Sequence, residues 1–247
     1  MITHSDREYE PENALRPGLE LVIFDCDGVL VDSERIGAEA TSAFVSKLGL
    51  AMTPQEAHDM FLGLASPQVV EILQEKLGRK LAPETIRARD QALEDRMHLT
   101  PPPPIAGALD LLAGLQALKV PMRVGSNSLP HEMEMKFRHA DMERYFPPGN
   151  IHSATALGHP KPSPFVYEQA ARAAGVPPER CVVIEDSDAG AEAALKAGMS
   201  CLLLRPEGRK LPPWWPAPHF QRISSLSEAL PLIRARLAPE ISSRKLN

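Results

Sequence analysis

Two aspartates stand directly after an apolar run near the start of the chain. The run 19–24 is followed by Asp25 and Asp27, one residue apart, and then by Gly28. Side chains of a strand alternate between two faces, so both carboxylates begin on the same side, and glycine lets the backbone turn sharply behind them. Ligands of open α/β sheets bind at the carboxyl ends of strands. Two like charges held there need a cation, a shared proton or a reaction that uses them. The segment therefore predicts a buried strand that carries an acidic pair into a ligand site.

Three later segments also place polar residues where an apolar or loop segment ends. They are Ser126 and Asn127 in VPMRVGSNS, Lys161 in GHPKPSPF, and Glu185 and Asp186 in CVVIEDSDAG. Taken singly, these residues suit a turn, a solvated lysine and a helix N-cap. Their shared position after apolar runs favours one common site at the carboxyl edge of a sheet.

With these four motifs the chain resembles the haloacid dehalogenase-like superfamily, which mostly comprises phosphohydrolases. The segment from Asp25 to Ser33 matches the family pattern D-x-D-G-x-L-x-D-S/T, and the resemblance covers roughly residues 19–204. It implies an α/β fold, with a Rossmann-like doubly wound parallel sheet as core and an inserted all-helical cap. Within the first subgroup of the superfamily, the chain is similar to the β-phosphoglucomutase and sugar phosphatase group.

The resemblance and the chemistry of phosphoryl transfer suggest roles for these residues. Asp25 is suited to attack phosphorus and form an aspartyl-phosphate. Asp27 is the candidate general acid and base, which requires its pKa to move toward the working pH, and we expect neighbouring carboxylates to raise it. Lys161 would bridge the nucleophile and the transferring group. Ser126 and Asn127 would offer a hydroxyl and an amide to the phosphate oxygens.

A carboxylate that approaches a phosphate dianion is repelled, and a divalent cation is the usual remedy. Mg²⁺ prefers oxygen ligands and uses one or two carboxylates together with substrate phosphate. We therefore expect Mg²⁺ on Asp25 and Asp186. The resemblance adds the backbone carbonyl of Asp27, with Glu185 bound directly or through water.

The periodicity of apolar residues divides the chain into two predicted domains. Residues 33–104 read as an all-helical cap, with helices near 54–61, 66–77 and 83–99 and a return hinge in the four prolines 101–104. Residues 19–32 and 105–237 alternate strands with helices, which indicates a parallel sheet covered on both faces. The predicted later strands lie near 122–125, 151–153, 181–184 and 200–204. Residues 1–18 and 238–247 are expected to be flexible termini, and Trp214 and Trp215 are expected to pack on the core.

The most favoured function is a Mg²⁺-dependent phosphatase acting on a small phosphate monoester, a sugar or sugar-acid phosphate. A phosphosugar mutase of the β-phosphoglucomutase type is the alternative, and a non-catalytic ligand-binding module is a third. Mutases of this subgroup carry a basic residue in a cap loop for the second phosphate. The corresponding stretch 60–68, MFLGLASPQ, contains no Arg or Lys, and this favours the phosphatase.

Composition agrees with a cytoplasmic enzyme that acts on a small phosphorylated metabolite. The net charge of −5 argues against a nucleic-acid-binding surface, and no apolar run is long enough to span a membrane. Cys26, Cys181 and Cys201 lie in apolar runs without C-x-x-C spacing, which indicates reduced, buried thiols. The expected assembly is a monomer or a weak homodimer.

Overall fold

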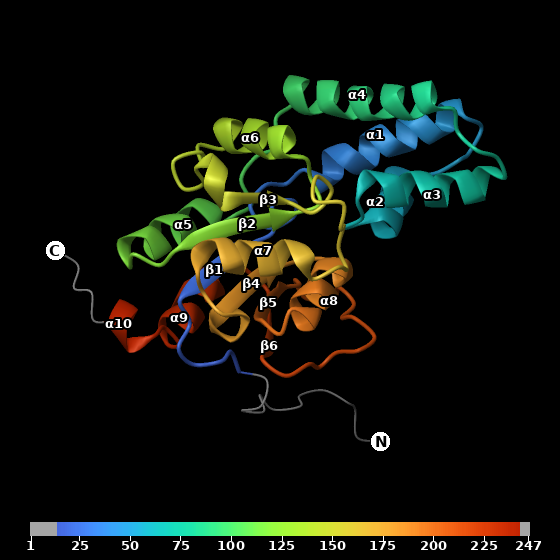
Figure 1. Cartoon of the computed structure of the whole chain (residues 1–247). Helices are drawn as coiled ribbons and strands as arrows, with labels where there is room; N and C mark the ends of the chain where they lie inside the picture. The colour runs from blue at the N-terminus through green and yellow to red at the C-terminus, as the bar shows by residue number, and fades with distance from the viewer. Residues whose placement is uncertain (1–13, 243–247) are drawn as a thin grey trace, which may run out of the picture.

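A six-stranded parallel sheet forms the centre of the protein in the computed structural model, which describes residues 14–242 (Figure 1). Its strands are β1 (Leu21–Phe24), β2 (Met122–Ser126), β3 (Ile151–Ser153), β4 (Cys181–Glu185), β5 (Ser200–Leu204) and β6 (Phe220–Ile223). Their order is β3-β2-β1-β4-β5-β6, and all adjacent pairs are parallel. The strand order reverses at β1, so the carboxyl end of β1 lies at the topological switch point where such sheets bind ligands. The predicted fold class is confirmed.

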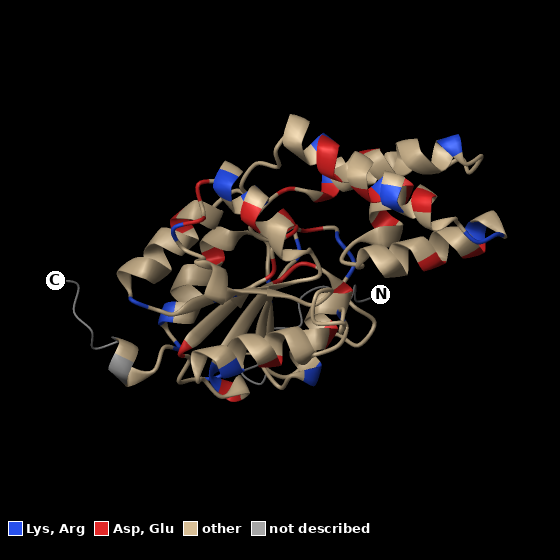
Figure 2. Ribbon diagram, turned by 45° about the horizontal axis from the view of Figure 1, so that its top comes forward, with Lys and Arg blue, Asp and Glu red and all other residues tan. Residues whose placement is uncertain are grey.

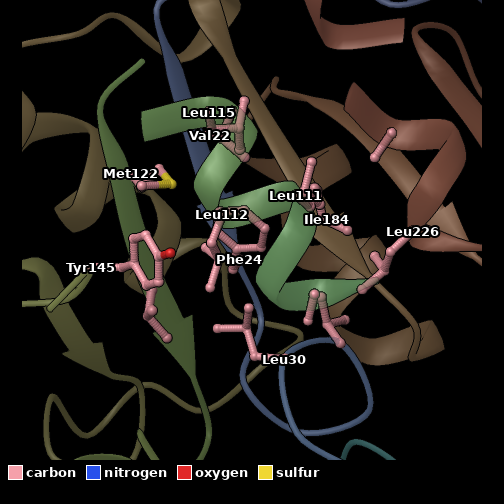
Figure 3. Packing of buried hydrophobic residues seen from close by; sticks show 14 of the residues in the cluster. Val22, Phe24, Leu30, Leu111, Leu112, Leu115, Met122, Tyr145, Ile184 and Leu226 are labelled. Carbon is pink, nitrogen blue, oxygen red and sulfur yellow. The ribbon is translucent and has the colours of Figure 1, made fainter. Parts of the chain in front are cut away.

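Alternate residues of β1 point into two separate hydrophobic cores. Val22 and Phe24 belong to the core under α5, α6 and α9, whereas Leu21 and Ile23 belong to the core under α7 and α8. Figure 3 shows the first of these cores, with Phe24 close to Leu112 of α5. The covering helices are α5 (Ala108–Ala117), α6 (Pro130–His139), α7 (Phe165–Ala174), α8 (Asp188–Lys196), α9 (Ala229–Arg234) and α10 (Pro239–Ser242). Because β1 is covered on both faces, all four of its residues are buried.

Four further helices lie together between β1 and β2 in the chain and project beyond the carboxyl edge of the sheet (Figure 1). They are α1 (Glu34–Lys47), α2 (Pro54–Phe61), α3 (Ser66–Leu77) and α4 (Pro83–Leu99). Residues such as Val45 and Leu73 form a small core of their own. The segment that leads into these helices and the segment that leads back from them lie side by side, because Val31 and Pro104 form an isolated antiparallel β-bridge. We propose that this group is the cap domain and keep the boundaries 33–104 as a prediction.

The structure corrects the sequence analysis at the sheet edge. Phe220–Ile223 forms β6, a strand that was not predicted. Leu15 and Ile241 are buried; the flexible termini 1–18 and 238–247 stay a prediction, and residues 1–13 and 243–247 lie outside the described residues. Trp214 and Trp215 pack on Phe220, as predicted. Among residues 14–242, no helix combines the length and the apolar character needed to cross a bilayer.

Candidate active site

Three carboxylates meet where β1 and β4 end. Asp25, Glu185 and Asp186 are all buried, and one oxygen of each lies within 4.8 Å of the others. Figure 2 shows acidic residues gathered at these strand ends beneath the cap. Gly28 has a φ of +78°, and a Cβ at this position would overlap the Asp186 carboxylate. The glycine therefore allows the turn after β1 to approach the acidic cluster closely.

Lys161 neutralises part of this negative charge. Its Nζ lies 2.9 Å from Asp25 Oδ1 and 2.8 Å from Glu185 Oε1. Burial lowers the pKa of the Lys161 ammonium, but Asp25 and Glu185 outweigh this effect and hold that pKa above its ordinary value. Lys161 is therefore a fixed positive charge beside the proposed nucleophile.

Glu185 differs from its two acidic neighbours because both its oxygens already accept hydrogen bonds. Oε1 accepts from Lys161 and from the Tyr167 hydroxyl at 3.0 Å. Oε2 accepts from the backbone N–H groups of Asp186 and Ser187 and from the Ser187 hydroxyl. Burial raises the pKa of Glu185, but Lys161 and these hydrogen bonds outweigh it, so the pKa lies below its usual range. The residue is placed to orient Lys161 and Asp186, which favours contact with a cation through water.

Asp25 and Asp186 show the opposite behaviour. Burial raises the pKa of Asp25 to about 8, an effect that Lys161 opposes and that Glu185 and Asp27 increase. Burial, followed by the charges of Glu34 and Glu185, also holds the pKa of Asp186 well above its usual range. Neither Asp186 oxygen has a hydrogen-bond partner among the described residues. Buried carboxylate oxygens without partners are costly, and a hard divalent cation would satisfy them.

Asp27 points toward a different set of partners. Its Oδ1 accepts from Lys136 Nζ at 2.7 Å and from the Ser33 hydroxyl, and its Oδ2 accepts from Ser128 Oγ at 2.6 Å. Burial raises the pKa of Asp27, but Lys136 outweighs it, so the pKa is lowered from its usual value. The expectation that neighbouring carboxylates raise this pKa is wrong, because α6 delivers a buried lysine to Asp27.

The sequence analysis missed Lys136 and Ser128. A signal for Lys136 was present: Met133 and Phe137 are the apolar residues of the buried face of α6, and Lys136 lies on the same face. A lysine on such a face is rarely buried unless it is paired. Ser128 stands two residues after Ser126, at the start of the same turn.

Ser126 and Asn127 lie in the same cavity as Asp25 and Lys161. The Asn127 side chain accepts from the Lys161 backbone N–H at 2.9 Å and donates to the Gly63 carbonyl of the cap at 3.0 Å. In this conformation the Asn127 amide joins the cap to the core, and its role as a donor to phosphate stays a prediction. Ser126 accepts from the Ser128 backbone N–H, so its hydroxyl proton is free to donate elsewhere.

The cavity between core and cap has a volume of about 260 Å³. This is slightly below the ~300–1,000 Å³ of typical small-molecule pockets. Cap residues close it, among them Phe61, Leu64 and Arg89. The stretch 60–68 lacks a basic residue, but Arg89 of α4 supplies one to the same cavity, so that stretch alone does not exclude a second anionic group in the substrate.

The comparisons with known proteins agree with this geometry. A family model described as "Haloacid dehalogenase-like hydrolase" matches residues 22–204, which is most of the chain and includes all four motifs. The chain belongs to the haloacid dehalogenase-like hydrolase family. The predicted resemblance is confirmed, and so is the expectation of an enzyme of the hydrolase class.

Individual relatives support the same assignment. A 6-phosphogluconate phosphatase of Escherichia coli strain K12 is 33% identical over 181 residues, which is 73% of this chain and 80% of that protein. A hydrolase of this family from Deinococcus radiodurans, solved with bound phosphate and sodium, is 31% identical with a TM-score of 0.68, covering 92% of this chain and 97% of that one. A β-phosphoglucomutase from Clostridium difficile shares the fold at 21% identity, with a TM-score of 0.66 over 75% of this chain and 84% of that one.

Proposed function

We propose that this hydrolase is a Mg²⁺-dependent phosphatase that cleaves a small phosphate monoester, a sugar or sugar-acid phosphate. The observation that carries the proposal is the pairing of Asp25 with Lys161 beside the buried oxygens of Asp186, which accept no hydrogen bond within the described residues, in a cavity between core and cap. The similarity to a 6-phosphogluconate phosphatase supports the substrate class.

In the first step, a carboxylate oxygen of Asp25 attacks phosphorus while the ester P–O bond breaks. The leaving oxygen takes a proton from Asp27, and an alcohol departs. Lys161 and the Ser126 hydroxyl offset charge on the phosphoryl oxygens. The lowered pKa of Asp27 describes the free protein, and an incoming phosphate dianion raises that pKa because it disfavours a second negative charge nearby.

In the second step, water attacks phosphorus in the aspartyl-phosphate. Asp27, now ionised, takes a proton from this water, and the bond between Asp25 and phosphorus breaks to release phosphate. Lys136 favours the ionised form of Asp27, which is the form that can accept this proton, and at the same time lowers the basicity of that carboxylate. Asp25, Asp186 and the backbone carbonyl of Asp27 would hold Mg²⁺, with Glu185 acting through water. The cation would supply charge compensation between carboxylate and phosphate.

The proposal is tested by phosphate release from p-nitrophenyl phosphate and from a panel of sugar phosphates, with Mg²⁺ and with EDTA. We expect turnover that EDTA removes and that added Mg²⁺ restores. Asp25→Asn should abolish turnover while the thermal unfolding temperature stays near that of the wild type. Asp110→Asn makes the same change at an exposed position on α5 and serves as the control. Asp25 is not the nucleophile if Asp25→Asn keeps most of the wild-type rate.

A phosphosugar mutase is the second candidate, and the presence of Arg89 in the cavity favours it, because a cation in the cap could hold a second phosphate. The two activities differ in their product from a hexose 1-phosphate. Free phosphate supports the phosphatase, whereas an isomeric hexose phosphate supports the mutase. A non-catalytic binding module would retain the fold but show neither product with any divalent metal.

We propose a cytoplasmic protein whose partner is a small phosphorylated metabolite, without nucleic-acid or membrane partners, and which is a monomer or a weak homodimer. The three cysteines are buried and unpaired, which agrees with a reducing compartment.

A further inference from the structure

Arg89 is a buried arginine on the cap side of the cavity. It lies in α4, its exposed fraction is 6%, and it lines the same cavity as Asp25. Arginine is almost never this buried unless its donors are paired. The hydrogen-bond partners of its N–H groups therefore show whether Arg89 has a purely structural role.

The guanidinium of Arg89 is only partly paired. Nη1 donates to Ser66 Oγ at 2.8 Å and to Asp90 Oδ1 at 2.7 Å. The buried Nε N–H has no hydrogen-bond partner among the described residues. An unpaired buried donor is costly, more so when it is charged. Because Arg89 lines the cavity, an acceptor on a bound ligand would complete the hydrogen bonding of this side chain.

The charge of Arg89 is also incompletely neutralised. Asp90, its only carboxylate partner within the described chain, has a side chain that is 48% exposed, and pairs with such exposed partners are weak. The other buried cations of the cavity have partners in the core: Lys161 pairs with Asp25, and Lys136 pairs with Asp27. Arg89 is therefore a positive group that the cap contributes to this cavity.

We propose that Arg89, together with the Ser66 hydroxyl, is a specificity-determining anion subsite that binds a second anionic group of the substrate, a carboxylate or a second phosphate. The planar guanidinium presents several donors in a fork that matches both groups. A cavity of about 260 Å³ accommodates one small molecule, so the phosphate at Asp25 and the anionic group at Arg89 belong to the same substrate. This inference rests on the proposed phosphatase function and specifies its substrate class.

Two six-carbon substrates that differ at one end test the proposal. Gluconate 6-phosphate carries a carboxylate at C1, and glucitol 6-phosphate carries a hydroxymethyl group there. The measured quantity is the ratio of their kcat/KM values. We expect the wild type to favour the acid by about 10- to 100-fold, which is the size of a charge-assisted hydrogen bond. Glucitol 1,6-bisphosphate in place of the acid distinguishes a preference for phosphate from a preference for carboxylate.

Two variants should move this ratio in opposite directions. Arg89→Met should lower it by about 10- to 100-fold, and Asp90→Asn should raise it, because the competing carboxylate at 2.7 Å is removed. Arg87→Met removes the same charge from an exposed position on the same helix and should leave the ratio unchanged. If Arg89→Met does not fold, as judged by circular dichroism, Asp90→Asn decides the question at an exposed site.

The outcomes separate this inference from the function on which it rests. An unchanged ratio in a folded Arg89→Met protein overturns the anion subsite and leaves the phosphatase intact, and so does an unchanged ratio in Asp90→Asn. If the wild type hydrolyses none of the substrates, the phosphatase is overturned. Calorimetric titration of the wild type with the same two compounds then tests the subsite alone: preferential binding of the acid supports it, and equal binding overturns it.

Discussion

Replacing Lys136 by Met removes the buried positive charge next to Asp27. The two charged atoms are 2.7 Å apart, and the lysine is almost completely buried. At an effective dielectric constant of 20, their Coulomb attraction is about 6 kcal/mol. Desolvation of both ions offsets much of this, and loss of one partner from a buried pair costs ~3–5 kcal/mol. Asp27 keeps its hydrogen bonds to Ser33 and Ser128 and is 28% exposed, so we expect a loss of about 2–4 kcal/mol.

The assay is urea unfolding at pH 7 in EDTA, with the free energy of unfolding extrapolated to water. Lys196→Met is the matched control, because Lys196 pairs with Glu192 at the same distance of 2.7 Å. In contrast to the buried pair, the Lys196 side chain is 47% exposed and the Glu192 side chain is 39% exposed. Such a pair contributes ~0.3–0.5 kcal/mol. The reasoning is refuted if the two variants lose the same stability within about 0.5 kcal/mol.

We also expect the stability lost in Lys136→Met to depend on pH. The folded-state pKa of Asp27 is lowered, so its contribution to stability is present above its unfolded pKa of ~3.9 and is lost as the pH falls through the folded value. The difference in stability between the wild type and Lys136→Met should therefore be full at pH 7 and narrow below about pH 4. A difference that stayed constant down to pH 2 would contradict this ion pair as the cause.

Three other substitutions probe the site. Asp27→Asn should slow turnover by ~10² to 10⁴ and leave Mg²⁺ affinity in calorimetry nearly unchanged; unchanged turnover would remove its acid–base role. Gly63→Ala should lower kcat/KM and also lower the unfolding temperature, because Gly63 has a φ of +72° and the new methyl would overlap the Ser187 side chain and oppose cap closure; wild-type kinetics would refute this. Gly190→Ala would overlap the Glu185 carboxylate and should cost at least ~1–3 kcal/mol of stability in urea unfolding; a loss below 0.5 kcal/mol would contradict it.

Local patterns were enough to predict the fold class and the boundaries of the cap helices α2, α3 and α4. The start of α2 is an example: Thr53 accepts from the Glu56 backbone N–H, Glu56 accepts from the Thr53 backbone N–H, and Pro54 takes the first helical position. These interactions join residues that are close in sequence, so the amino-acid sequence alone predicts them. β6 was missed because it is a short edge strand after a Pro-rich segment, and its pairing with β5 is a contact between distant residues.

The sequence alone predicted candidate site residues at strand ends and in turns, which the parallel sheet brings together, but it missed Lys136 and Ser128. It did not reveal how those residues interact. Lys136 meets Asp27 across 109 positions of the chain, and Arg89 faces the cavity because the packing of the cap turns that side of α4 inward. The direction in which the pKa of Asp27 shifts and the positive charge that the cap contributes to the cavity both depend on these contacts. Electrostatic effects vary with distance and burial, and both are set when the domains pack.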